Sequence, residues 1–173
     1  SSVTTVAVGV PFGWLRKKPP VSPPYHDRPV AASMRLVHRY SVSVAEFRAA
    51  GLREGYDFHP VYLDDAERAS FYNGFSNEII WPLFHDLQSR CNFVPDYWTI
   101  YQLVTRKFAD VVQATVEPGD FIWVQDYHLI GLGRELRQRH IENKIGFFLH
   151  IPFPPPDIFC KLPWRNDVLE SLC

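Results

Sequence analysis

The sequence predicts an α/β fold in which a parallel β-sheet is flanked by helices. Two short apolar runs, Phe121–Gln125 and Ile145–His150, are rich in aromatic and β-branched residues, which is typical of buried strands. Between them, Leu129–Arg139 places leucines on one side of a predicted helix and arginines on the other. Because a strand–helix–strand unit pairs its strands in parallel through a right-handed crossover, we expect these two strands to be neighbours in one sheet.

Three further segments are candidate strands, and prolines mark the loops. Thr4–Val10 and Phe58–Leu63 have the apolar character of strands, and Arg35–Val44 alternates in part. Prolines recur between residues 19 and 29, where they fix the backbone and remove hydrogen-bond donors, so this stretch is predicted to be a loop. The same argument predicts a rigid loop over Pro152–Pro156.

Helix-capping residues predict three helices between residues 64 and 115. Asp64 followed by Glu67 resembles a capping box and should open a first helix. Ser76 or Asn77 is expected to cap a second helix, and Asp96 a long third one. The third helix has apolar residues at helical spacing from residue 97 to residue 112, so we expect it to bury one face.

Composition and charge exclude several classes of protein. Of the 173 residues, 46% are apolar and 21% are charged, which is enough to bury a globular core. The formal net charge is -1 and the basic residues are not clustered, so neither nucleic acid nor a membrane surface is predicted as a partner. No apolar run approaches the roughly 20 residues of a membrane helix, and the first ten residues lack the pattern of a signal peptide.

The three cysteines, Cys91, Cys160 and Cys173, are far apart and form no CxxC pair. This spacing is typical of a protein of the reducing cytosol, so we expect a cytoplasmic location without a disulfide scaffold or a zinc knuckle. The chain does not begin with Met and stops inside a predicted helix, so we expect a fragment that is cut at both ends.

Polar residues accompany both strands of the strand–helix–strand unit. Asp126 lies just past the first strand and His150 ends the second, and open parallel sheets bind ligands at this edge. Asp126 is explained either as the cap of the next helix, as a group that binds sugar hydroxyls, or as both. A lone histidine such as His150 is more often a core residue than a catalyst. Asp126, His128 and His150 also have the two-histidine, one-carboxylate composition of a metal site, but the sequence alone gives that alternative little support.

Aromatic stretches elsewhere in the chain are typical of a core, although aromatic rings also stack on sugars. Together with the strand-end motifs, they resemble the trehalose-6-phosphate synthase family, glycosyltransferase family 20. The segments that carry this resemblance occur in the order and spacing of the family. They are Tyr72–Asn77, Trp81–His85, Lys107–Asp110, Phe121–Leu129, Lys144–Pro154 and Leu162–Pro163.

The resemblance implies a Rossmann-like parallel sheet flanked by helices, as part of the N-terminal domain of a GT-B glycosyltransferase. In this family glucose is transferred from UDP-glucose to glucose 6-phosphate with retention of configuration, without a catalytic metal or other cofactor. Residues 56–173 match the acceptor-side Rossmann-like domain, truncated, whereas residues 1–55, with the proline-rich loop at about 19–29, match poorly. The C-terminal donor domain is absent, so this segment alone is expected to be inactive. A homo-oligomer is conceivable for the full-length protein.

Five residues match functional positions of the family. Tyr72 and Asp126 match acceptor-binding positions for glucose 6-phosphate. Trp81 and Ile151 match positions that shape the sugar pocket, and His150 matches the histidine at the reaction centre. The resemblance therefore implies that His150 is catalytic, by positioning the donor glucose and stabilising developing charge rather than as a nucleophile.

Departures from the family leave two alternatives open. The family often has His where this chain has Gln125, and the glycine-rich donor loop is not visible here. A glucosylglycerol-phosphate synthase, which shares the donor but uses glycerol 3-phosphate, is the enzymatic alternative. A non-catalytic module that senses sugar phosphates or binds another subunit is the other.

Overall fold

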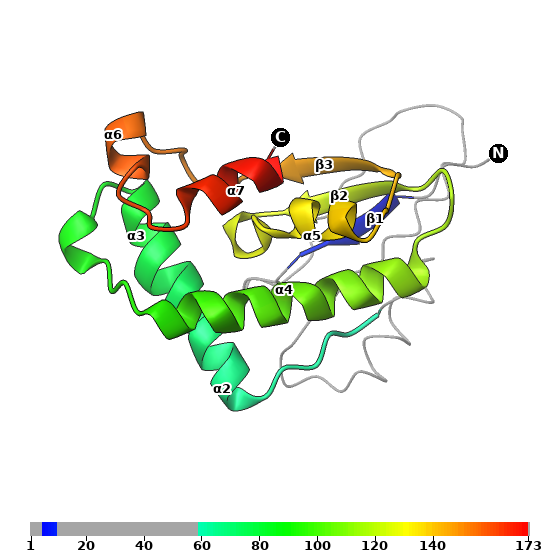
Figure 1. Cartoon of the computed structure of the whole chain (residues 1–173), viewed down its shortest axis with the longest axis horizontal. Helices are drawn as coiled ribbons and strands as arrows, with labels where there is room; N and C mark the ends of the chain where they lie inside the picture. Colours follow the sequence, from blue (N-terminus) through cyan, green and yellow to red (C-terminus); the bar gives the residue numbers. More distant parts are fainter. Residues whose placement is uncertain (1–4, 10–58, 173) are drawn as a thin grey trace, which may run out of the picture.

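The computed structural model describes residues 5–9 and 59–172, which form an α/β arrangement around a parallel sheet (Figure 1). The strands are β1 (Thr5–Val8), β2 (Phe121–Gln125) and β3 (Lys144–Phe148). They are ordered β1-β2-β3, and both neighbouring pairs are parallel. The central strand β2 is therefore hydrogen-bonded on both sides, and its carboxyl end is flanked by those of β1 and β3.

The predicted parallel pairing of the two strands is confirmed. Phe121 pairs with Lys144 and Gln125 pairs with Phe148, so the two strands end side by side. The strand predicted over residues 4–10 is β1. The strand predicted over residues 58–63 is wrong for its described part, because residues 59–63 form no ladder with the described strands. The strand predicted over residues 35–44 and the loop over residues 19–29 lie outside the described residues.

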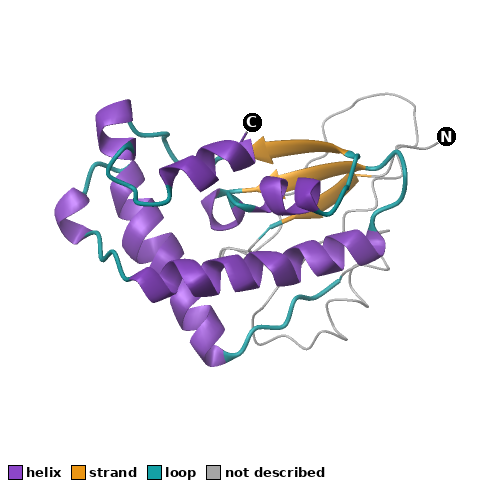
Figure 2. Cartoon of the chain, in the orientation of Figure 1, coloured by secondary structure: helices purple, strands orange, loops and turns teal. Residues whose placement is uncertain are grey.

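One continuous helical run extends from residue 65 to residue 84 (Figure 2). It consists of α2 (Asp65–Arg68), a π-helical segment η1 (Ala69–Ile80) and α3 (Trp81–Phe84). Its predicted capping box is confirmed. The Glu67 N–H donates to Asp64 Oδ1 at 2.8 Å, and the Asp64 N–H donates to Glu67 Oε2 at 3.0 Å.

The predicted helix break at Ser76 or Asn77 is wrong. Both residues lie inside η1, where Ser76 Oγ donates to the Phe71 carbonyl and Asn77 Nδ2 donates to the Tyr72 carbonyl, each at 2.8 Å. These carbonyls lie five residues earlier, which is the hydrogen-bond spacing of a π-helix. The polar side chains therefore support a wider helix instead of capping a new one.

The long helix α4 (Pro95–Thr115) runs beside the sheet and the crossover helix (Figure 1). Its N-cap is Val94 and its first residue is Pro95, so the prediction that Asp96 caps it is wrong. Proline suits this first position because its φ is already helical, and Asp96 in the first turn faces the positive end of the helix dipole. The predicted buried face is confirmed. Its buried residues are Tyr101, Val104, Thr105, Phe108, Ala109 and Val112.

The crossover between β2 and β3 contains a 3₁₀ turn, η3 (Tyr127–Leu129), and the helix α5 (Leu132–Gln138). Leu132 and Leu136 are fully buried, as the spacing of leucines predicts. Arg134 of α5 pairs with Asp167 and Glu170 of α7 (Arg165–Leu172). The helix is shorter than the predicted 129–139, because η3 occupies its expected first turn.

Short elements complete the described chain. Residues 149–155 are irregular, as their prolines predict, and lead into α6 (Pro156–Phe159) and then α7. The 3₁₀ turn η2 (Gln88–Arg90) connects α3 to α4. Within residues 5–9 and 59–172, no helix combines the length and apolar character that crossing a membrane requires.

The core lies between the sheet and the helices on one of its faces. Ile122 and Val124 of β2 are buried in it, together with the inner faces of η1, α4 and α5. Because strand side chains alternate between faces, Trp123 and Gln125 belong to the other face of the sheet, where Trp123 is 40% exposed.

Candidate active site

Asp126 ties together the carboxyl ends of β2 and β3. Its backbone N–H donates to the Phe148 carbonyl at 2.7 Å, and its Oδ1 accepts from the backbone N–H groups of Tyr127 at 2.8 Å and His150 at 3.2 Å. The carboxylate therefore caps η3 and also fixes the segment after β3. His150 lies two residues past β3 rather than at its last position. The expected meeting of Asp126 and His150 at one edge of the sheet is observed.

The backbone of Asp126 is strained. Its φ of 69° and ψ of 165° lie in a region that is essentially restricted to glycine and costs other residues on the order of 1–3 kcal/mol. The side chain is 4% exposed and makes the two hydrogen bonds that glycine could not make. A carboxylate held in such a conformation at a strand end is typical of a functional site, since strained backbone concentrates where geometry is used.

His128 connects Tyr72 to Asp126. Its ring stacks on Tyr72 at a centroid distance of 5.2 Å and on Tyr127 at 4.0 Å. Its Nδ1 lies 3.9 Å from Asp126 Oδ2. The side chain is fully buried, and burial lowers the pKa of His128 to about 3. His128 is therefore neutral at pH 7 and acts as a packing element beneath the predicted site.

Asn77 and Tyr127 join the helical run to the crossover. The Tyr127 hydroxyl donates to Asn77 Oδ1 at 2.9 Å, and Asn77 Nδ2 donates to the Tyr72 carbonyl. Burial, followed by the negative charge of Asp126, raises the pKa of Tyr127, so its hydroxyl stays protonated and serves as a donor. This bond fixes the π-helical turn that carries Tyr72 against the turn that follows Asp126.

His150 is exposed and faces Gln125. Its Nε2 lies 2.8 Å from Gln125 Oε1, and its ring meets the ring of Phe148 edge to face at 4.7 Å. It is thus a surface residue at the sheet edge, and the alternative of a core histidine is wrong. The neighbouring Ile151 is half-buried and packs against the core.

Trp81 lies on the same helical run as Tyr72, nine residues further on. Its indole is 38% exposed and stacks on His85 at 4.2 Å, and His85 Nδ1 lies 2.7 Å from the Trp81 carbonyl. A chain of contacts therefore joins Tyr72, through His128, to Asp126 and His150. The ring contact of Trp81 lies instead within its own helix.

The described residues contain no group of three or more His, Cys, Asp or Glu side chains arranged to hold a metal ion. In the alternative of an Asp126, His128 and His150 ligand set, the buried His128 ring stacks on Tyr72 and Tyr127, and the His150 ring contacts Gln125. Of these two histidines, only His128 has a ring nitrogen near the Asp126 carboxylate, with Nδ1 3.9 Å from Oδ2, because Asp126 bonds to the backbone of His150.

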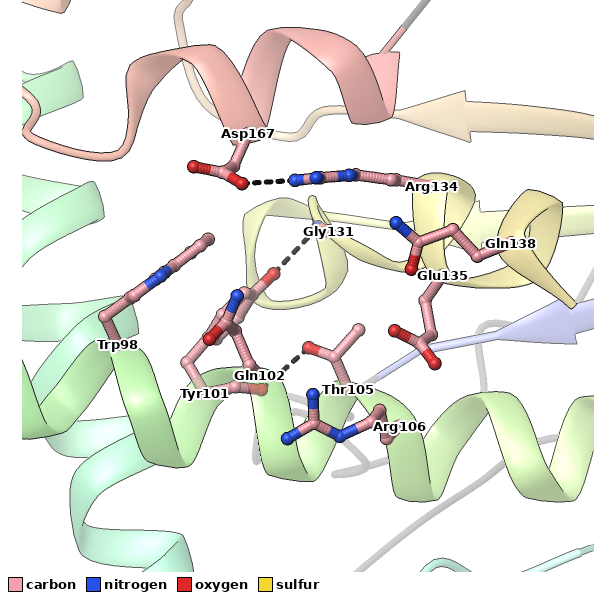
Figure 3. A pocket seen from close by; sticks show the side chains of 10 residues that line it. All are labelled: Trp98, Tyr101, Gln102, Thr105, Arg106, Gly131, Arg134, Glu135, Gln138 and Asp167. Carbon is pink, nitrogen blue, oxygen red and sulfur yellow. Dashed lines mark hydrogen bonds and ion pairs between the residues drawn. The ribbon is translucent and has the colours of Figure 1, made fainter.

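A separate hollow lies among α4, α5 and α7 (Figure 3). It has a volume of about 110 Å³, and Arg134 and Asp167 pair along one side of it. Inside it, the Gly131 N–H donates to the Tyr101 hydroxyl at 2.8 Å. None of the ten residues that line the hollow is one of the five predicted site residues. The hollow is therefore distinct from the group of Tyr72, Asp126 and His150 at the ends of β2 and β3.

Comparison with known proteins places this chain in a family. The sequence profile of Glycosyltransferase family 20 matches residues 32–173. The chain belongs to glycosyltransferase family 20. Among its family-20 relatives, the alpha,alpha-trehalose-phosphate synthase (UDP-forming) of Schizosaccharomyces pombe is 45% identical over 117 residues, which are 65% of this chain and 23% of that protein. The chain spans about a quarter of the length of the curated family-20 relatives that it matches.

Solved family-20 structures share the fold. An alpha,alpha-trehalose-phosphate synthase (UDP-forming) from Burkholderia xenovorans in complex with glucose-6-phosphate has a TM-score of 0.66 at 34% identity, covering 69% of this chain and 26% of that chain. An E. coli trehalose-6-phosphate structure bound with UDP-2-fluoro glucose has a TM-score of 0.73 at 28% identity, covering 98% and 38%. The chain is thus a Rossmann-like α/β part of the N-terminal domain of a GT-B glycosyltransferase, as the resemblance implies.

Two contacts among the predicted site residues and their neighbours are not predicted from the sequence. The contact of Gln125 with His150 and the stacking of Tyr72 on His128 join residues that are 25 and 56 positions apart. The only signal for the first is that Gln125 stands where the family often has His. The second has no signal in the local pattern, since Tyr72 is on a helix and His128 is in a turn.

Proposed function

We propose that the whole protein to which this chain belongs transfers glucose from UDP-glucose to glucose 6-phosphate, with retention, to give trehalose 6-phosphate. The proposal rests mainly on Asp126, which has a strained backbone and bonds to the backbone of His150 at the carboxyl edge of the sheet of a family-20 chain. The names of the relatives support it, because one similar structure is in complex with glucose-6-phosphate and another is bound with UDP-2-fluoro glucose.

In this proposal Tyr72 and Asp126 bind the acceptor sugar phosphate. The Oδ1 atom of Asp126 already accepts two backbone hydrogen bonds, so Oδ2 is the atom with acceptor capacity left for a sugar hydroxyl. Trp81 contributes an exposed indole face that suits a sugar ring, and Ile151 shapes the pocket beside His150. Each of these roles is carried over from the family and can be tested by substituting the residue.

His150 is proposed to act at the reaction centre without forming a covalent bond. Its exposed ring positions the donor glucose and stabilises charge that develops as the glycosidic bond to phosphate breaks. The donor phosphate takes the proton of the acceptor hydroxyl on the same face, which retains the configuration. No metal or other cofactor takes part in this scheme, and activity that survives a chelator is the corresponding test.

The test of function uses the intact protein with UDP-glucose and either glucose 6-phosphate or glycerol 3-phosphate. We expect UDP release with trehalose 6-phosphate as product, and a fall of about a hundredfold or more in turnover for His150→Ala, typical of a lost transition-state contact. Faster reaction with glycerol 3-phosphate would assign the protein to glucosylglycerol phosphate synthesis instead. Binding of glucose 6-phosphate without any transfer would show a sensing module.

The segment itself, residues 1–173, is proposed to be inactive when expressed alone. Orienting two substrates against each other can supply about 7–11 kcal/mol of a barrier, and in a GT-B enzyme the donor is held by the second domain. UDP release by this segment at the rate of the intact protein would refute the proposal that a second domain is needed to hold the donor. A cytoplasmic location, expected from the cysteine spacing, belongs to the same proposal, and cell fractionation tests it.

A further inference from the structure

The side chain of Gln125 is built into the sheet edge between β1 and β3. Gln125 ends the central strand β2 and pairs with Phe148 of β3. On the other side it packs over Gly9, which follows β1. A Cβ added at Gly9 would meet Gln125 Cβ at 3.2 Å and Cγ at 3.7 Å. Glycine at position 9 therefore leaves the space in which the glutamine stem lies, and the stem has little freedom to move.

The amide of Gln125 is directed at the ring of His150. Oε1 lies 2.8 Å from His150 Nε2, a normal hydrogen-bond distance. The amide nitrogen of Gln125 is buried and has no hydrogen-bond partner among the described residues. Phe148 flanks the His150 ring at 4.7 Å, and the Asp126 carboxylate bonds to the backbone of His150 and not to its ring. Among the described residues, Gln125 is thus the side chain within hydrogen-bond distance of the imidazole.

From this geometry we infer that Gln125 is a positioning residue that holds His150 in its neutral, Nε2-protonated tautomer. With the amide oxygen toward the ring, as in the structure, the ring nitrogen that faces it carries the hydrogen, because a carbonyl oxygen can only accept. An amide with its nitrogen toward the ring would give the opposite tautomer, which the measurement below distinguishes. The other nitrogen, Nδ1, is then an unprotonated acceptor that can face a sugar hydroxyl. A neutral amide also differs from a carboxylate partner, which would stabilise the imidazolium ion. The catalytic meaning of this arrangement rests on the proposed function, but the tautomer itself does not.

The tautomer is read directly by magic-angle-spinning NMR of the intact protein labelled with 15N-histidine. At a pH of about 8.5, where an ordinary histidine is neutral, protonated and unprotonated ring nitrogens have well separated 15N shifts. His150→Gln identifies the signals of His150. We expect a protonated Nε2 and an unprotonated Nδ1. A His150 ring that is protonated mainly at Nδ1 overturns the inference.

Gln125→Met and Gln125→Glu separate hydrogen bonding from packing. Methionine fills similar space with only the weak acceptor of a thioether, so we expect His150 to become a mixture of both tautomers. Glutamate keeps an acceptor oxygen, so Nε2 should stay protonated. Transfer by Gln125→Met should lose about tenfold in kcat, by analogy with residues that orient metal-binding histidines, with KM for the acceptor within about twofold.

Gln138→Met is the matched control, because Gln138 is exposed on α5. This variant should change neither the tautomer of His150 nor the rate of transfer. An unchanged tautomer in Gln125→Met overturns the inference, and if that variant does not fold, the wild-type spectrum decides. If the intact protein transfers glucose to neither acceptor, the proposed function fails while the tautomer measurement still stands.

Discussion

The strained backbone of Asp126 predicts an unusual order of stability when its side chain is removed. At ordinary positions alanine is more stable than glycine by roughly 0.5–1 kcal/mol, because glycine loses more backbone freedom on folding. At φ of 69° and ψ of 165° alanine bears a strain of about 1–3 kcal/mol that glycine does not. We therefore expect Asp126→Gly to be more stable than Asp126→Ala, by about 1 kcal/mol.

Both variants should be less stable than the native protein. Each loses the two hydrogen bonds that Oδ1 accepts from Tyr127 and His150, and bonds to a charged group contribute about 1.5–3 kcal/mol each. Asp126→Ala should thus lose about 3 kcal/mol or more. Asp126→Asn keeps an acceptor oxygen for the same two backbone N–H groups, although the bonds are weaker without the charge, so it should lose less stability than Asp126→Ala.

The assay is urea unfolding of the intact protein, followed by tryptophan fluorescence and compared between variants. Ala114→Gly is the control, since Ala114 is exposed on α4 and glycine there should be the less stable residue by about 1 kcal/mol. If Asp126→Ala proves at least as stable as Asp126→Gly, the backbone of Asp126 is not strained and the argument fails. In the transfer assay Asp126→Asn should mainly raise the acceptor KM, and an unchanged KM and rate would remove Asp126 from the site.

Two further predictions concern the packing around the site. Because the pKa of His128 is about 3 when folded and ordinarily about 6.5, the unfolded chain binds more protons between these values. The free energy of unfolding should therefore be highest above pH 6.5 and decrease as the pH is lowered, by about 1 kcal/mol at pH 5.5. His128→Phe should remove this share of the pH dependence, and an identical pH profile in that variant contradicts the assignment. Gly74→Ala should destabilise the protein by about 1–3 kcal/mol, although alanine favours helices, because its Cβ would lie 2.7 Å from the ring of Tyr97. Gly74→Ala in a Tyr97→Ala background should recover most of that loss, and no recovery would exclude this clash as the cause.

Local patterns in the sequence determine much of this fold. The two apolar runs around residues 121–125 and 144–148 and the leucines between them specify a parallel pair with a crossover helix, because only a strand–helix–strand unit buries all three. The capping box of Asp64 and Glu67 and the apolar face of α4 were equally predictable, since each depends on residues three or four positions apart. The strand-end rule likewise brings Asp126 and His150 to one edge.

Other features were decided by tertiary structure. Ser76 and Asn77 have the composition of helix caps, but inside a helix packed against α4 their side chains bond to carbonyls five residues back, and the helix continues as a π-helix. The segment at residues 59–63 has the apolar character of a strand and lacks a described partner strand. A strand exists only through its neighbours, so its composition alone could not settle the question.

Tertiary structure also decided which side chains of the candidate site are in contact. The sequence placed Gln125, Asp126 and His150 near one another, but the ring of His150 faces Gln125 only because β2 and β3 pair in one register. A shift of one residue would turn Gln125 to the core face of the sheet. Burial lowers the pKa of His128, and one of the rings that stack on it belongs to Tyr72, 56 positions earlier. The sequence by itself determined which groups reach the sheet edge, and the tertiary structure decided which of them touch, because those contacts depend on register and on packing between distant segments.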